Sequence, residues 1–172
     1  MSREYALSCA AAPSIWRAAL SFLVILASCA KSQKETTLTS QEIAIDSYVS
    51  SYVEENPDSR FVVNGGSWRL VLEEGDGTIL VERGDYVRMV SSYYIFSSGK
   101  GLNFVPENEA WFTIGNSELL KGVEMGITGA GAGEKCQIIF SAQYGFGDEQ
   151  VGIVPAMSPI IVEILIKEIE KN

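Results

Sequence analysis

Short β-rich segments separated by glycine-containing turns run through most of the chain, and this pattern constrains the fold more than any other feature. Trp68, Leu70 and Leu72 alternate with other residues, as in a strand with one buried face. Further strands are expected over residues 86–96, 109–114, 135–141 and 160–169, with turns at 75–77, 97–101 and 129–133. One helix, expected over residues 117–126 with Ser117 as its cap, interrupts the strands. This order predicts an α+β fold in which a curved antiparallel sheet wraps over a short helix.

A second helix is expected before the strands. Thr39 followed by Glu42 fits a capping box, and apolar residues recur at helical spacing from Ile45 to about Glu55. Pro57 ends this helix, because proline restricts the residue before it and offers no N–H. A helix of this length is marginal alone, so we expect its apolar face to dock on the sheet domain. Binding of a partner by the same face is the alternative.

The N-terminal region predicts secretion and lipid anchoring. Residues 18–27 form an apolar run after Arg17, too short for a membrane span, which needs about 20 apolar residues. The run ends in Leu-Ala-Ser-Cys at residues 26–29, which resembles the lipobox of bacterial lipoproteins, with the Cys29 thiol as the acceptor of the lipid. A plain secretory signal with an incidental cysteine is the alternative.

These signals divide the chain into four parts. They are a lipoprotein signal peptide (1–28), a flexible polar tether (29–38), a helical lead-in (39–65) and the strand-rich domain (66–172). The mature protein is expected in the bacterial cell envelope, anchored to the outer membrane and facing the periplasm or the surface. With a net charge of −9, the protein gains nothing from an anionic surface, so the acyl chains must supply its membrane affinity.

Composition excludes several kinds of site. The sequence has no histidine, which rules out histidine-dependent zinc sites and Ser-His-Asp or Cys-His catalysis. The acidic charge without a basic stripe argues against nucleic acid as a partner. Cys9, Cys29 and Cys136 show no CxxC spacing, and Cys136 is expected as a small buried residue in a strand. The glycines at 129–133 precede a strand rather than a helix, so they do not form a phosphate loop. No cofactor and no metal are expected.

A series of short motifs follows in a fixed order along residues 66–171. The motifs are GDYV (84–87), SGKG (98–101), FTIG (112–115), ELLKG (118–122), GEK (133–135), YGFG (144–147), GIVP (152–155) and VEI (162–164). Their sequence and spacing resemble the FK506-binding-protein (FKBP) family of peptidyl-prolyl isomerases. The helical lead-in also resembles that of lipoprotein members of the family. The resemblance implies an FKBP-like fold.

The same resemblance implies a chemistry that needs no acid, base or metal. Rotation about an X–Pro bond is slow because amide resonance sets a barrier of about 18–20 kcal/mol. An apolar pocket disfavours the planar, more dipolar amide and holds a twisted one, which lowers that barrier. The implied partners are proline-containing peptides or envelope client proteins.

The pocket is carried over from the family residue by residue. The predicted pocket residues are Leu102, Asn103, Leu119, Leu120, Val123, Phe146, Ile153, Val154 and Val162. A strand tyrosine of the family falls at Ser92 and a strand phenylalanine at Ala110, so of the family's aromatic positions only Phe146 is still aromatic. Trp111, Tyr94 or Phe104 are candidates to refill the space, and a one-residue change of register places Tyr93 inward. The backbone N–H of Leu120 is the expected donor to a ligand carbonyl.

Three functions remain open from the sequence. The first is a prolyl isomerase or isomerase-like folding factor with weak activity, acting on envelope proteins. The second is a non-catalytic binding module that keeps the FKBP-like scaffold with an altered pocket. The third is a structural lipoprotein without a ligand. Acceleration of proline isomerisation by the folded protein distinguishes the first from the other two.

Overall fold

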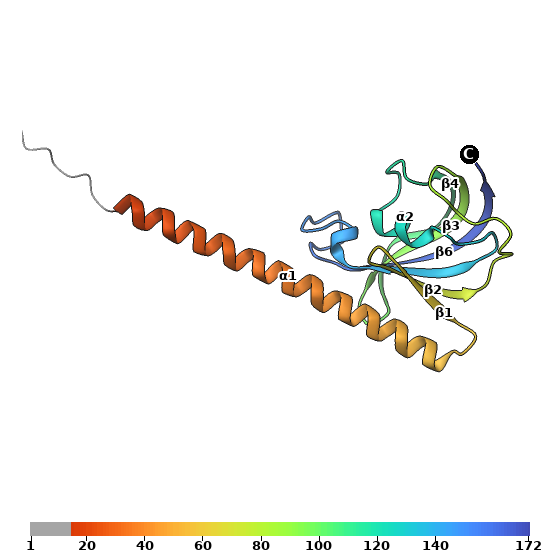
Figure 1. Cartoon of the computed structure of the whole chain (residues 1–172), viewed down its shortest axis with the longest axis horizontal. Helices are drawn as coiled ribbons and strands as arrows, with labels where there is room; N and C mark the ends of the chain where they lie inside the picture. Colours follow the sequence, from red (N-terminus) through yellow and green to blue (C-terminus); the bar gives the residue numbers. More distant parts are fainter. Residues whose placement is uncertain (1–14) are drawn as a thin grey trace, which may run out of the picture. The chain divides into compact units, whose positions relative to one another are not determined.

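The computed structural model describes the backbone of residues 15–172 and the side chains of residues 33–172. The chain divides after Thr36 into two compact units. The described part of the first unit is helical and belongs to α1 (Ile15–Glu55), and the second unit holds the remainder of α1 and the sheet (Figure 1). The start of the predicted signal peptide and the Cys29 side chain lie outside the described residues. Within the part of the chain described, no helix is both long and apolar enough to cross a membrane.

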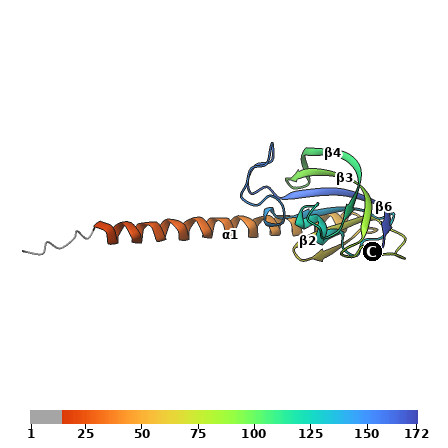
Figure 2. The same cartoon turned by 90° about the horizontal axis from the view of Figure 1, so that it is seen from above.

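The second unit is built on one antiparallel sheet. Its strands are β1 (Arg60–Asn64), β2 (Ser67–Glu73), β3 (Tyr86–Phe96), β4 (Lys100–Thr113), β5 (Lys135–Phe140) and β6 (Ile160–Glu170). Their order across the sheet is β1-β2-β5-β6-β3-β4, so β1 and β4 form the two edges. Figure 2 shows β4, β3 and β6 side by side in this order. The predicted α+β class is confirmed.

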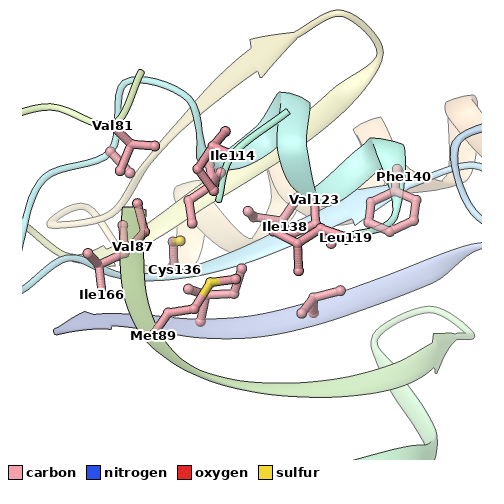
Figure 3. Close-up of a cluster of buried hydrophobic side chains, with 14 of the residues drawn as sticks. Val81, Val87, Met89, Ile114, Leu119, Val123, Cys136, Ile138, Phe140 and Ile166 are labelled. Carbon is pink, nitrogen blue, oxygen red and sulfur yellow. The ribbon is translucent and has the colours of Figure 1, made fainter. Parts of the chain in front are cut away.

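One face of the sheet is covered by the short helix α2 (Lys121–Ile127). Buried side chains from α2 and the strands form an inner cluster, whose members include Val123, Ile138 and Phe140 (Figure 3). The helix approaches the sheet so closely that a Cβ at Gly122 would collide with the Phe140 ring. Glycine at this position is therefore a packing requirement.

The opposite face is covered by the second half of α1. Ile45 and Val49 are both 0% exposed and pack against an outer cluster with Trp68, Leu70 and Ile139. Full burial of an aliphatic side chain of this size stabilises the fold by roughly 1.5–3 kcal/mol. The predicted docking of the lead-in helix is thus confirmed. Because both faces are covered, the central strands are buried on both sides rather than one.

The buried Arg69 of β2 holds the end of α2 through hydrogen bonds and pairs with the Glu134 carboxylate. Arg69 donates hydrogen bonds to the carbonyls of Ile127, Thr128 and Gly129, which lie where α2 ends and lack partners within the helix. Its Nε lies 3.3 Å from Oε1 of Glu134, and the two side chains are only 5% and 3% exposed. The arginine therefore fixes the helix against the sheet from inside the protein.

Three boundaries differ from the sequence prediction. Helix α1 already includes the residues predicted as a tether and begins at Ile15 rather than Thr39, because residues 30–38 contain no proline or glycine to stop a helix. Strand β1 was not predicted, since its five residues are too few to show a clear alternation. Strand β4 begins at Lys100, well before residue 109, because its polar first half pairs with β3.

Ser117 does not cap α2, which is a further correction. The helix begins at Lys121, with Leu120 at the N-cap position, and Ser117 adopts a left-handed backbone with φ 71°. The Glu124 carboxylate accepts hydrogen bonds from the backbone N–H groups of Gly115 and Ser117, at 3.1 and 3.3 Å. A side chain from the first turn of the helix therefore organises the preceding residues as a turn.

Candidate functional site

The inner cluster brings together many of the predicted pocket residues. Val123 of α2 and Val162 of β6 are both 0% exposed, and Leu119 is buried beside them. Leu120 and Phe146 are partly buried and pack against the same cluster. These residues form a buried apolar floor, with Leu120 and Phe146 as partly exposed side chains at its rim.

The remaining predicted residues lie away from this floor. Leu102 and Ile153 are 56% and 62% exposed, and Asn103 is exposed on β4. Val154 is buried, within a small turn in which Val151 and Val154 exchange backbone hydrogen bonds of 3.0 Å. The ligand-contacting roles of all nine predicted pocket residues stay predictions.

Three aromatic rings line the rim of the inner cluster. The centroids of Tyr93 and Phe104 lie 6.0 Å apart, and those of Phe104 and Phe146 lie 6.1 Å apart with an edge-to-face geometry. The rings come from β3, from β4 and from the loop after the short 3₁₀ turn at Ala142–Tyr144. Spacings of this kind are typical of favourable aromatic pairs. We call this set the aromatic triad.

The triad settles the register of β3. Tyr93 faces the inner cluster, whereas Ser92 lies on the opposite face, with its Oγ 3.4 Å from the hydroxyl of Tyr94. The expectation of an inward Ser92 is therefore wrong, and the alternative with Tyr93 inward is confirmed. The β3–β4 ladder shifts register between Ser91 and Phe96. These shifts do not reverse the faces of β3: its pairing with β6 is continuous from Met89 to Ile95, and Val87 and Met89 already belong to the inner cluster, so alternation along β3 places Tyr93 on that face.

Of the aromatic residues named as candidates to refill the pocket, Trp111, Tyr94 and Phe104, only Phe104 packs against the inner cluster. Trp111 stacks on Tyr86, with centroids 4.6 Å apart and planes at 14°, and the Arg88 guanidinium lies 5.7 Å from its ring. Tyr94 packs against the outer cluster, with Lys100 Nζ 5.4 Å from its ring. The aromatic side chain that reaches the inner cluster from this part of β4 is therefore Phe104, two residues after Leu102.

The backbone at Leu120 offers the predicted hydrogen-bond donor. Leu120 precedes the first helical residue, with φ −60° and ψ 141°, and its carbonyl accepts from the N–H groups of Val123 and Glu124. Its own N–H comes before the first turn and so has no partner within α2. The donor therefore belongs to a residue that also packs on the pocket floor.

Burial shapes the titration of the polar groups nearby. Desolvation raises the pKa of the Tyr93 hydroxyl, with a hydrogen bond to Ser91 opposing it, so the phenol stays neutral. Desolvation also raises the pKa of the Cys136 thiol, which is fully buried in β5. This agrees with the predicted structural role of Cys136. The inner cluster and its rim thus combine apolar surface, a neutral phenol and a backbone N–H.

Comparison with known proteins identifies the family. A sequence model of the FKBP-type peptidyl-prolyl cis-trans isomerases matches residues 80–167, more than half of the chain. The protein belongs to this family. FK506-binding protein 1A of Neurospora crassa is 33% identical over 108 residues, which cover 59% of this chain and 89% of that protein.

Two further relatives define the extent of the similarity. Human peptidyl-prolyl cis-trans isomerase FKBP14 is 39% identical over 62 residues, and the match spans only 29% of its length. The crystal structure of FkpA from Escherichia coli aligns with a TM-score of 0.58 at 16% identity, covering 91% of this chain and 71% of that one. At this identity the FkpA match establishes the fold alone. The sequence relatives establish the family.

Proposed function

We propose that the protein catalyses cis–trans isomerisation of X–Pro bonds in protein substrates. The observation that carries the proposal is the aromatic triad of Tyr93, Phe104 and Phe146 on the rim of an apolar floor. Its rings are positioned to pack around a proline ring, while the N–H of Leu120 donates to the carbonyl of the substrate. Membership of the isomerase family supports the same conclusion.

Catalysis by such a pocket requires only differential binding. A substrate amide twisted out of plane loses resonance and becomes less dipolar, so an apolar site binds it better than the planar form. Because Val123 and Val162 replace family aromatics on the floor, part of the contact area is missing. Each aromatic contact is worth about 0.5–1.5 kcal/mol beyond its area, so we expect weak activity compared with family members that retain these rings.

The proposed setting is the bacterial cell envelope. The apolar run before Cys29 and its lipobox-like ending support cleavage and acylation at this cysteine. The acylated protein then acts on secreted or outer-membrane clients from the membrane surface. Incorporation of labelled palmitate into the chain, and its loss in Cys29→Ser, tests this setting. Labelling that persists in the variant contradicts it.

An isomerisation assay on the full chain tests the activity, with the residue before proline varied. Phe146→Ala should lower kcat/KM about tenfold, because it removes one ring of the triad and its contact with Phe104. Trp111→Ala is the matched control, since this ring lies outside the inner cluster and should leave the rate unchanged. A rate equal to the uncatalysed one, from protein shown to be folded by circular dichroism, rejects the proposal.

A non-catalytic binding module is the second candidate. Val123 and Val162 are fully buried, so the floor itself is closed and only the rim is open to a ligand. A rim of this kind suits binding of an apolar segment without deep insertion of a proline. Saturable chemical-shift changes with a proline-containing peptide, without acceleration of its isomerisation, would favour this function.

A further inference from the structure

Gln41 of α1 bridges the two ends of the loop between β5 and β6. Its Oε1 accepts a hydrogen bond from the N–H of Ala142 at 2.9 Å, and its Nε2 donates to the carbonyl of Met157 at 2.7 Å. The orientation of the amide is determined by its partners, because one is a donor and the other an acceptor. Gln41 lies one turn before the buried Ile45, so it belongs to the face of α1 that packs on the sheet.

The loop that Gln41 spans, residues 142–157, is closed by its own backbone. The N–H of Gly147 donates to the carbonyl of Ala142, and the N–H of Met157 donates to the carbonyl of Gly147, both at 2.8 Å. Met157 has φ 58°, a left-handed conformation that residues with a side chain rarely adopt. The N–H of Met157 is held by Gly147 inside the loop, and the carbonyl of Met157 is held by Gln41 of α1. The helix therefore contributes directly to holding an unfavourable backbone conformation.

The same loop carries part of the proposed pocket. Phe146 contacts Phe104 in the aromatic triad, and Val154 is 2% exposed within the loop. We propose that Gln41 is a positioning residue for the prolyl pocket: it joins the two ends of the 142–157 loop and so keeps Phe146 against its partner ring. The inference rests on the proposed isomerase function.

The expected benefit of this contact is pre-organisation. A loop that is already ordered loses less conformational entropy when a peptide binds, so affinity rises without a new contact to the peptide. Loss of both hydrogen bonds should shift the loop towards open conformations by about tenfold, given the net strength of two such bonds. The lead-in helix then forms part of the site rather than a spacer before it.

Gln41→Ala in the full chain tests the inference, with Gln143→Ala as its matched control. Gln143 also joins the loop to α1, through an exposed hydrogen bond of 2.7 Å to Glu42, but this bond reaches only the first end of the loop and does not bridge it to Met157. Amide hydrogen exchange at Gly147 and Met157, followed by NMR, should become about tenfold faster in Gln41→Ala and stay unchanged in the control. KM for a proline-containing peptide should rise about three- to tenfold, with a smaller change in kcat.

Gln41→Glu supplies a rescue experiment that a purely structural loss would not show. An ionised carboxylate still accepts from Ala142 but places an oxygen against the Met157 carbonyl, so protection is lost at neutral pH. Below the glutamate pKa of about 4.3, the protonated group donates to that carbonyl again and protection should return. The neighbouring Glu42, bonded to Gln143, is present in both proteins, so wild type at the same pH is the reference.

Each outcome decides the inference. Unchanged exchange in Gln41→Ala overturns it, and so does faster exchange with an unaltered KM. If wild-type protein neither binds nor isomerises the peptide, the proposed function fails and the positioning role with it. The exchange rates then still show whether Gln41 holds the loop, so the two failures are distinguishable. Faster exchange and a raised KM in Gln41→Ala, together with rescue of Gln41→Glu at low pH, support the positioning role of Gln41.

Discussion

The two faces of the sheet differ in how they are closed. The outer face is sealed by α1, whose Ile45 and Val49 are fully buried. The inner face is covered by the seven residues of α2 and by loop residues such as Val81 and Ile114, and leaves Tyr93, Phe104 and Phe146 partly exposed. One face thus gives its apolar surface to stability, while the other keeps some of it available for a ligand. The same strands serve both purposes because their side chains alternate between the faces.

The largest effect on stability is expected from the buried ion pair of Arg69 and Glu134 on the inner side of the sheet. Glu134→Ala should lower the free energy of unfolding by about 3–5 kcal/mol, because it leaves the Arg69 guanidinium buried without its carboxylate. Urea unfolding measures the loss. The double variant Arg69→Leu with Glu134→Leu removes both charges and should be less destabilised than the single one. A Glu134→Ala protein as stable as wild type would show that the helix-end carbonyls alone satisfy Arg69.

A smaller loss of stability is expected from a substitution on the outer face of the sheet. Ile45→Ala should lower the free energy of unfolding by about 2–5 kcal/mol, because it removes a fully buried side chain and leaves a cavity under α1. Ile43→Ala, on the same helix but 66% exposed, is the matched control and should change little. Equal effects of the two substitutions would mean that α1 is not held on the sheet in solution.

The pH dependence of stability gives the smallest effect and compares carboxylates of different burial. Desolvation raises the pKa of Asp85, but hydrogen bonds from Lys171 and from the backbone N–H groups of Glu82 and Asn172 lower it on balance. Glu163, on the outer face, is also lowered on balance: desolvation opposes its hydrogen bonds from Lys100 and Gln137.

Since both folded pKa values lie below the unfolded ones, the stability they add is complete above the unfolded values and is lost as pH falls through the folded values. Asp85→Asn and Glu163→Gln should each flatten the acid limb of stability against pH. The Asp85 variant should flatten it more, because its side chain is 4% exposed while that of Glu163 is 30% exposed. Thermal melts between about pH 2 and 6 measure this. A steeper limb in either variant contradicts the assignment.

The fold was largely predictable because its signals are local. Turns at Gly75 to Gly77 and Ser97 to Gly101 and the alternating residues of β6 place β2, β3 and β6 within a few positions. The pocket was less predictable because it depends on register. The motif alignment placed Ser92 inward, although alternation from the buried Val87 and Met89 of the same strand places Tyr93 on the inner face.

Long-range polar contacts were the least predictable part of the site. Gln41 is more than 100 residues away from Ala142 and reads as an ordinary surface residue of an amphipathic helix. Arg69 likewise looks like the polar member of an alternating strand, although it is buried against the end of α2. Only the packing of helices on both faces makes these side chains interior.

The two edges of the sheet differ in their resistance to unwanted strand addition. Strand β4 contains Pro106, which has no N–H to offer, and charged Glu107 and Glu109 beside it, so an incoming chain finds a poor template there. Strand β1 exposes Phe61 and Val63 and is protected mainly by its length of five residues. Co-aggregation with extended polypeptides would therefore begin at β1, and a charged residue in place of Val63 is the simplest safeguard for handling this protein at high concentration.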